Sequence, residues 1–214
     1  MNYEVNEMNI LYSLLCLVLG YLLGSIPFAL IIGKLFYHTD IRKHGSGNLG
    51  GTNAGRVLGK KAGIAVIVCD VLKVVAALGV ASLISPVVAT WTGLACCIGH
   101  CYPVFAHFHG GKAVSTVFGF LLGMSLFVFK DASFFLVPFA MFFITLYLFK
   151  FVSLASICGI LCGTLYITAV LWYFNADNIL IILACWLMSA LVVYRHTKNI
   201  VAIRNGEERK ISWM

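Results

Sequence analysis

Long apolar stretches, separated by short polar loops, follow one another along the whole chain. They do not alternate apolar and polar residues at every second position, as the strands of a membrane barrel would. A helix that spans a bilayer needs about 20 mostly apolar residues. Seven stretches approach that length: Ile10–Tyr37, Ala62–Ser85, Val87–Cys101, Ala113–Phe129, Ala132–Phe149, Ser153–Phe174 and Asn178–Tyr194. We therefore expect an all-α membrane protein in which residues 1–214 form a single domain, a seven-transmembrane-helix bundle.

The composition supports the bilayer as the solvent for most of this chain. Of its 214 residues, 61% are hydrophobic and only 11% are charged, and the mean hydropathy is +0.97. A soluble domain carries roughly 25% charged residues, because its surface must face water. The shortage of charge excludes most soluble enzymes, disordered proteins and nucleic-acid-binding modules, so no nucleic-acid partner is expected.

Basic residues indicate which loops face the cytoplasm. Of the 15 Lys and Arg residues, 13 fall in one alternating set of loops and their flanks, whereas the opposite set holds only Lys130 and a predicted helix contains Lys73. Cytoplasmic loops are enriched in Lys and Arg, so we expect the N-terminus outside and the C-terminus in the cytoplasm. All six histidines and the glycine-rich loops fall on the cytoplasmic side. The active site is therefore expected at the cytoplasmic face.

The first predicted cytoplasmic loop is rich in glycine and small polar residues and ends in an arginine. Glycine allows backbone N–H groups to converge on an anion, and the N-terminus of the following helix favours an anion. Arg56 could hold a phosphate through two hydrogen bonds. The candidate phosphate-binding residues are Gly45, Ser46, Gly47, Asn48, Gly50, Thr52, Asn53 and Arg56. The alternative is a flexible linker, which has no particular need for these amide, hydroxyl and guanidinium groups.

A second glycine-rich segment places Gly110, Gly111 and Lys112 directly before a predicted helix. A lysine near a helix N-terminus opposes the helix dipole unless an anion joins it. This arrangement favours a second phosphate site. His100, earlier in the same segment, could donate a hydrogen bond or carry a proton. No set of His and Cys residues has credible metal-ligand spacing, so no metal site is expected.

Two further motifs and one ionisable pair complete the candidates. Ser153 begins a predicted helix, where an N-cap role would be a sufficient explanation. His196 and Asn199 would share a face if the last helix continues, although a basic stop after the last span is equally compatible. Asp70 and Lys73 lie three residues apart inside a predicted span. Their spacing favours a structural ion pair over a role in substrate binding.

These stretches together resemble one family, the bacterial acyl-phosphate:glycerol-3-phosphate acyltransferases. The resemblance covers Gly24-Ser25-Ile26-Pro27, Ser46–Arg56, Gly99-His100 through Gly110-Gly111-Lys112, Ser153, and Arg195-His196-x-x-Asn199-Ile200. It implies seven spans in the bacterial cell membrane, an outside N-terminus and motifs at the cytoplasmic face. In agreement with it, no histidine is followed by an acid five residues later, which is the signature of CoA-dependent acyltransferases.

The resemblance implies a reaction and its partners. A long-chain acyl group would pass from acyl phosphate to the sn-1 hydroxyl of glycerol 3-phosphate, as the first acylation step of phospholipid synthesis. The products would be lysophosphatidate and inorganic phosphate, and no cofactor is implied. The expected partners are the two substrates and the lipid bilayer, and the enzyme that produces the acyl phosphate is a candidate partner.

The resemblance also suggests roles for the candidate residues. Those expected to be catalytic are Ser46, Arg56, His100, Lys112 and His196. The first loop would hold the acyl phosphate head through Ser46, Asn48, Thr52 and Asn53, and Arg56 and Lys112 would neutralise phosphates. Glycerol 3-phosphate would be seated by Ser153, His196 and Asn199. Either His100 or a substrate phosphate would take the hydroxyl proton.

The rival interpretation is a small transporter or binding protein for an organic anion, which also needs anion sites and broken helices. Transporters commonly show paired repeats and a site near the bilayer midplane. This sequence shows no convincing repeat, and its polar residues cluster at one predicted face. A purely structural membrane scaffold would leave both glycine-rich loops unexplained.

Overall fold

The computed structural model describes residues 7–174 and 178–211, which form helices, turns and loops without a strand. The α-helices are α1 Glu7–Gly24, α2 Phe28–Tyr37, α3 Gly51–Leu58, α4 Lys60–Ala81, α5 Pro86–Cys101, α6 Val114–Gly123, α7 Ser133–Phe149, α8 Val152–Tyr173, α9 Ile179–Arg195 and α10 Thr197–Arg204. Short 3₁₀ turns form η1 (Ile41–Lys43) and η2 (Val104–Ala106), and a π-helical segment forms η3 (Met124–Phe129). The predicted all-α class is confirmed for these residues.

Not every predicted span is long enough to cross a membrane alone. Among the described residues, four helical stretches pass by length and composition: Asn9–Tyr37, Lys60–Ala81, Pro86–Ala106 and Val152–Tyr173. A fifth is added if α9 and α10, which meet at a bend of 54°, count together. The stretch Val114–Phe129 and α7 are shorter apolar helices. The structure thus has four or five spans by this measure, and the seven predicted spans and their sidedness stay a prediction.

The first span is broken where the sequence has Gly24-Ser25-Ile26-Pro27. Proline lacks a backbone N–H and disfavours helical geometry at the residue before it, so α1 ends and α2 starts in a new direction. The Ser25 hydroxyl donates to the Tyr21 carbonyl oxygen at 2.8 Å and meets part of the hydrogen-bonding need of the break. This interruption was not expected from the apolar pattern, which predicted one continuous helix.

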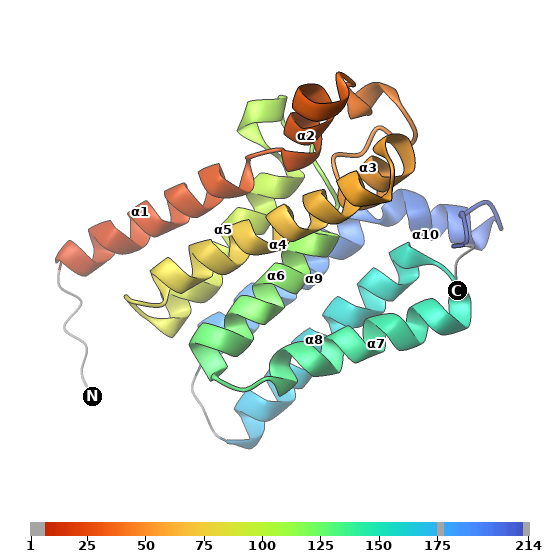
Figure 1. Ribbon diagram of the computed structural model, residues 1–214. Coiled ribbons are helices and arrows are strands. Elements are labelled where there is room, and N and C mark those ends of the chain that lie inside the picture. The colour runs from red at the N-terminus through yellow and green to blue at the C-terminus, as the bar shows by residue number, and fades with distance from the viewer. Residues whose placement is uncertain (1–6, 175–177, 212–214) are drawn as a thin grey trace.

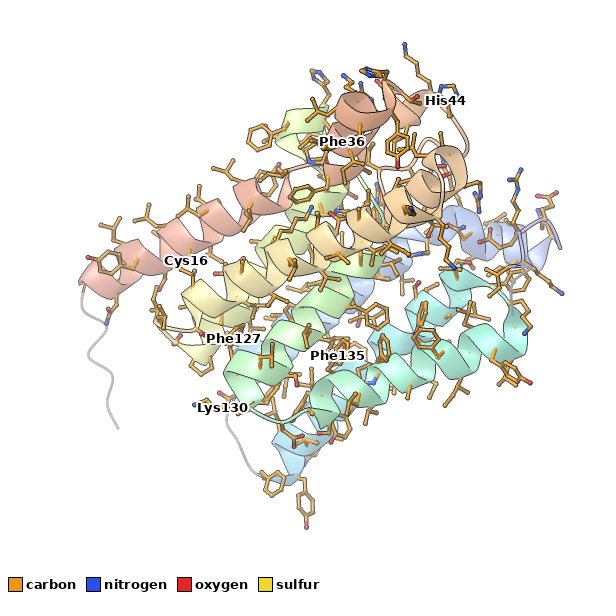
Figure 2. The ribbon with its side chains drawn as sticks, viewed as in Figure 1. Cys16, Phe36, His44, Phe127, Lys130 and Phe135 are labelled. Atoms are coloured by element: carbon orange, nitrogen blue, oxygen red, sulfur yellow. The ribbon has the colours of Figure 1, made fainter. Side chains whose placement is uncertain are left out.

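The helices lie side by side as a bundle whose two ends differ in character (Figure 1). The helices α2, α3 and α10 gather at one end, whereas the turns α4–α5 and α6–α7 lie at the other. Figure 2 accordingly shows His44, in the first loop, and Lys130, between η3 and α7, at opposite ends. The polar motifs therefore share one end of the bundle, which we call the loop end.

Close approach between α1 and α5 depends on glycine. A Cβ atom on Gly24 would collide with the Cys96 backbone, and one on Gly20 would lie 2.8 Å from the Thr92 side chain. Small residues allow membrane helices to approach closely and gain dispersion contacts where no hydrophobic driving force separates them from lipid. Outside the bundle, large apolar side chains such as Leu19, Leu83 and Trp172 are exposed. This distribution is that of a protein surrounded by lipid.

A buried cluster of ionisable groups joins several breaks in the helices. The Lys73 ammonium of α4 lies 2.8 Å from Asp70 Oδ1, which confirms the predicted ion pair, and donates to the Ile26 carbonyl oxygen at 3.0 Å. The His100 ring at the end of α5 approaches both, with Nδ1 3.3 Å from Lys73 Nζ and 3.4 Å from Asp70 Oδ1. Ser115 at the start of α6 donates to Asp70 Oδ2 at 3.4 Å.

Loss of one charge from this cluster should cost far more than loss of both. Removing one partner of a buried ion pair leaves an uncompensated charge and typically costs about 3–5 kcal/mol. We expect Asp70→Ala to lower the unfolding temperature in detergent strongly. The double variant Asp70→Leu with Lys73→Met should be closer to wild type, and Asp131→Ala, which removes an exposed carboxylate, should change little. A double variant less stable than Asp70→Ala would contradict this account.

Candidate active site

Asn53 gives the first glycine-rich loop its shape. Its Oδ1 accepts the Ser46 backbone N–H at 2.9 Å, and its Nδ2 donates to the Ile41 and His44 carbonyl oxygens at 3.3 and 3.2 Å. The side chain is only 1% exposed. The predicted contact between Asn53 and substrate is thus replaced by contacts within the loop, because both ends of the amide already have backbone partners.

Glycine is required where this loop turns most sharply. Gly45 and Gly47 adopt φ values of 63° and 68°, which side chains other than glycine rarely tolerate. Around these turns Ser46, Thr52 and Arg56 are exposed and Asn48 is half-buried. The loop therefore presents hydroxyl, amide and guanidinium groups to its surroundings beside the N-terminus of α3, as the sequence predicted for an anion site.

The second glycine-rich segment is held between α5 and α9. The Gly111 N–H donates to the His100 carbonyl oxygen at 3.0 Å. Arg195 grips the other side, because its Nε donates to the Gly111 carbonyl oxygen at 3.1 Å and its guanidinium also donates to that of Gly110 at 3.3 Å. A Cβ on Gly111 would collide with the His100 imidazole. Only glycine fits this position, and the segment is fixed in place rather than free.

His100 is part of the buried ion cluster and not an open group of the site. Its side chain is 5% exposed, and its Nδ1 lies among Asp70 and Lys73. Its ring supports Gly111 from beneath. The position of His100 therefore favours the other expected source of a base, a substrate phosphate.

Lys112 meets residues from two distant segments. Its ammonium donates to Asn199 Oδ1 at 2.5 Å. The Asn199 amide donates in turn to Glu208 Oε1 at 2.8 Å, and the Ser153 hydroxyl donates to the same oxygen at 2.7 Å. Ser153 is thus more than an N-cap. We call these four residues, Lys112, Ser153, Asn199 and Glu208, the lysine group.

Electrostatics around the lysine group favour an added anion. Burial lowers the pKa of Lys112, and the nearby positive charges of Arg195 and Lys198 lower it further, whereas Glu208 opposes the shift. A lowered lysine pKa means that the charged form is under strain from its surroundings. A phosphate beside Lys112 would relieve that strain, since it would add negative charge where Glu208 alone now supplies it.

His196 lies at the junction of α9 and α10 and is 2% exposed. Its Nδ1 donates to the Val192 carbonyl oxygen at 2.8 Å, which leaves Nε2 as the ring nitrogen able to meet another group. Among the described residues, no hydrogen bond connects the first loop to the lysine group or to His196. The candidate site thus consists of two separately built parts, both at the loop end (Figure 1).

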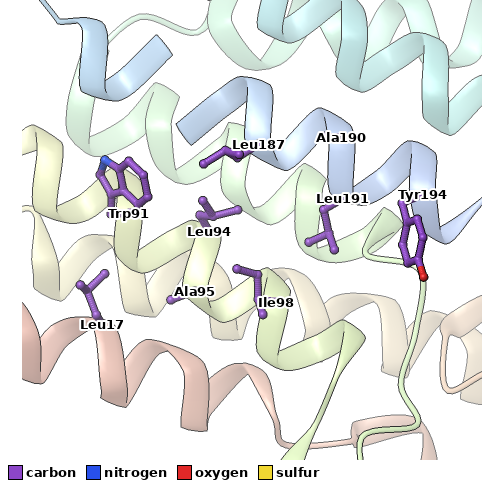
Figure 3. Close-up of a pocket in the computed structure, with 9 residues that line it drawn as sticks. All are labelled: Leu17, Trp91, Leu94, Ala95, Ile98, Leu187, Ala190, Leu191 and Tyr194. Atoms are coloured by element: carbon purple, nitrogen blue, oxygen red, sulfur yellow. The ribbon is translucent and has the colours of Figure 1, made fainter. Parts of the chain in front are cut away.

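An apolar groove extends from the loop end along the bundle. Its floor is α5, which packs against both α1 and α9, and those two helices form its walls. The groove encloses about 560 Å³. Figure 3 shows Tyr194 at one end and Trp91 at the other, with Leu94 and Leu191 on the way. Tyr194 directly precedes Arg195 and His196, so the groove ends beside the polar residues.

Comparison with known proteins identifies the family. The family model described as glycerol-3-phosphate acyltransferase matches residues 14–206. A glycerol-3-phosphate acyltransferase of Geobacillus kaustophilus is 46% identical over 200 residues, which cover 93% of this chain and 96% of the relative. One of Bacillus cytotoxicus is 43% identical over 200 residues, with coverages of 93% and 95%. The chain belongs to the glycerol-3-phosphate acyltransferase family. It is an acyltransferase.

Two solved structures of the acyltransferase PlsY, an integral membrane protein, have the same fold. One, in its glycerol 3-phosphate form, superposes with a TM-score of 0.84 at 34% identity, covering 94% of this chain and 96% of that one. The other, in its lysophosphatidic acid form, gives a TM-score of 0.80 at 33% identity with the same coverages. This acyltransferase is accordingly a bacterial membrane protein.

Sequence reasoning found most of the polar residues of this acyltransferase but missed two that organise them. Glu208 joins Ser153 to Asn199, and Arg195 holds the carbonyls of Gly110 and Gly111. A single acid in an otherwise basic tail was the available signal for Glu208. Arg195 was counted only as a positive charge marking the cytoplasmic side, because its backbone partners are 84 and 85 residues away in the sequence.

Asn53 should be required for the shape of the first loop rather than for contact with substrate. In Asn53→Ala, the Ser46 N–H and two buried carbonyl groups lose their partner, and each such loss costs about 1–3 kcal/mol. We expect acyltransferase activity to fall at least tenfold, together with increased proteolysis of residues 44–50. Asn48→Ala, which removes a half-buried amide from the same loop, should leave proteolysis unchanged. Equal proteolysis of wild type and Asn53→Ala would show that Asn53 does not order the loop.

Proposed function

We propose that this acyltransferase transfers a fatty acyl group from acyl phosphate to the sn-1 hydroxyl of glycerol 3-phosphate. The products are lysophosphatidate and inorganic phosphate, and the reaction is the first acylation of phospholipid synthesis. The observation that carries this proposal is the lysine group beside the clamped Gly110-Gly111 segment, because it combines donors for a phosphate with one end of an apolar groove. The family and the glycerol 3-phosphate form of PlsY support the acceptor.

The acceptor phosphate is assigned to the lysine group. Lys112 supplies a charge whose pKa is already lowered by burial, and Ser153 and Asn199 supply donors that now point at the Glu208 carboxylate. A carboxylate and a phosphate accept the same hydrogen bonds. His196 Nε2 is the nitrogen suited to meet the glycerol part, since Nδ1 is held by Val192.

The donor is assigned to the first loop and the groove. Ser46, Asn48, Thr52 and Arg56 present donors for the phosphate of the acyl phosphate at the N-terminus of α3. The acyl chain lies in the groove between α1, α5 and α9, whose lining is almost wholly apolar. The reactive carbonyl is then held where the groove meets the polar residues, and the chain never has to leave an apolar environment.

This arrangement requires no nucleophile from the protein. Acyl phosphate is a mixed anhydride with a good leaving group, so the glycerol hydroxyl oxygen attacks the carbonyl carbon directly and the bond to the phosphate oxygen breaks. The hydroxyl proton passes to a substrate phosphate, and inorganic phosphate leaves. The protein contributes alignment of two bound anions and positive charge near the developing oxyanion. No metal or other cofactor takes part in this scheme.

The bundle is proposed to cross the membrane seven times, with the loop end in the cytoplasm. The crossings are Asn9–Tyr37, α4, α5, α6 with η3, α7, α8 and α9. A bilayer can thin around helices shorter than its apolar thickness at modest cost, which accommodates α6 with η3 and α7. The N-terminus is then outside, although residues 1–6 themselves fall before the described part of the chain.

Replacement of Lys112 tests the acceptor site. Lys112→Met keeps the apolar stem and removes the charge, so we expect kcat/KM for glycerol 3-phosphate to fall at least a hundredfold with little change in unfolding temperature. Lys198→Met removes an exposed neighbouring charge and should keep most activity. Labelled glycerol 3-phosphate is supplied with palmitoyl phosphate or with palmitoyl-CoA, and labelled lipid is measured. Near wild-type turnover of Lys112→Met would refute the assignment, and turnover only with palmitoyl-CoA would refute the proposed donor.

Reporter fusions test the orientation. Alkaline phosphatase folds only outside the cytoplasm, so we expect it to be active when fused after Asp131 and inactive when fused after Gly59. A fluorescent reporter that matures in the cytoplasm should give the opposite pattern. Activity of the phosphatase at both positions would contradict the proposed sidedness.

A further inference from the structure

A second, smaller cavity continues the groove away from the loop end. It encloses about 190 Å³ and is lined by Ser13, Val87 and Val88 together with Leu17 and Trp91. Leu17 and Trp91 also line the main groove. These two side chains, one from α1 and one from α5, therefore form the partition between the two cavities. Figure 3 shows the Trp91 indole at the end of the groove opposite Tyr194.

The occupant of the main groove follows from its two ends. One end adjoins Arg195 and His196, and the rest is enclosed by Leu, Ile, Ala and Trp side chains. A molecule that fits must have a polar head at the loop end and a flexible apolar tail. Within the proposed function, on which this inference rests, that molecule is the long-chain acyl phosphate.

We infer that Trp91, with Leu17, limits the length of the acyl chain that this enzyme accepts. Trp91 lies ten residues before the end of α5, or about 15 Å along the helix axis. A chain that enters from the loop end runs along α5 and meets the indole ring at this depth. Chains that end before the ring fit without bending, whereas longer chains must bend out of the groove or displace the ring.

The discrimination is steric and not hydrophobic. The acyl chain comes from the bilayer, which is as apolar as the groove, so additional methylene groups gain little by entering it. A closed hydrophobic pocket distinguishes substrates that differ by one methylene by roughly 10- to 200-fold. Because this groove is open to lipid along one side, we expect a value near the lower limit.

Trp91→Ala joins the two cavities and tests this inference. We measure kcat/KM for lauroyl, myristoyl, palmitoyl, stearoyl and arachidoyl phosphate with the purified enzyme in lipid. The ratio of activity with stearoyl and arachidoyl phosphate to activity with myristoyl phosphate should rise about tenfold over wild type. Trp172→Ala, which removes an indole that is 80% exposed on α8, should keep the wild-type profile. Leu17→Ala opens the same partition from α1 and should shift the profile in the same direction.

The outcomes separate this inference from the proposed function. Wild-type enzyme that fails to use any acyl phosphate would refute the proposed function itself. Wild-type turnover with an unchanged profile in both Trp91→Ala and Leu17→Ala would refute the length limit and leave the proposed function intact. An equal loss of activity at every chain length would also refute it, because a purely structural role of Trp91 affects all donors alike. If Trp91→Ala does not fold, Leu17→Ala decides the question.

Discussion

The buried cluster of Asp70, Lys73 and His100 is the interaction on which the arrangement of the loop end depends. Apolar packing alone can hold straight helices together, but it does not determine where irregular backbone lies. Lys73 satisfies the Ile26 carbonyl at the break before α2, and Ser115 at the start of α6 donates to Asp70. His100 supports Gly111 from below. Three interruptions of the helices are thus tied to one point on α4, at the depth where an unpaired polar group would be costly.

The protein separates the charged and apolar parts of its chemistry along the bundle axis. Positive charge collects at the loop end, where Lys112 and Arg195 face each other across the glycine segment and only Glu208 offsets them locally. The groove beside α5 begins at the same end. A lipid with a phosphate head can therefore bind with each part in a suitable medium. The rival interpretation as an anion transporter does not explain why a long apolar groove ends at the polar residues.

Sequence alone predicted the helices well because bilayer-facing segments are apolar over nearly their full length. It also predicted that Ser46, Arg56, Lys112, Ser153, His196 and Asn199 come to one end, since the pattern of basic loops indicates a common side. It did not predict the roles of Asn53 and His100. Amide and imidazole groups can bind either a ligand or the protein's own backbone, and only the folded contacts distinguish these uses. Glu208 and Arg195 were missed because their partners are distant in sequence.

The most direct test of the account is the stoichiometry of the reaction catalysed by the purified protein in lipid. Palmitoyl phosphate and glycerol 3-phosphate are supplied separately and together, and inorganic phosphate and lysophosphatidate are measured in the same samples. The account predicts that both products appear in equal amounts and only when both substrates are present. Phosphate release from palmitoyl phosphate alone, or no turnover by demonstrably folded protein, would contradict acyl transfer between two anions held at the loop end.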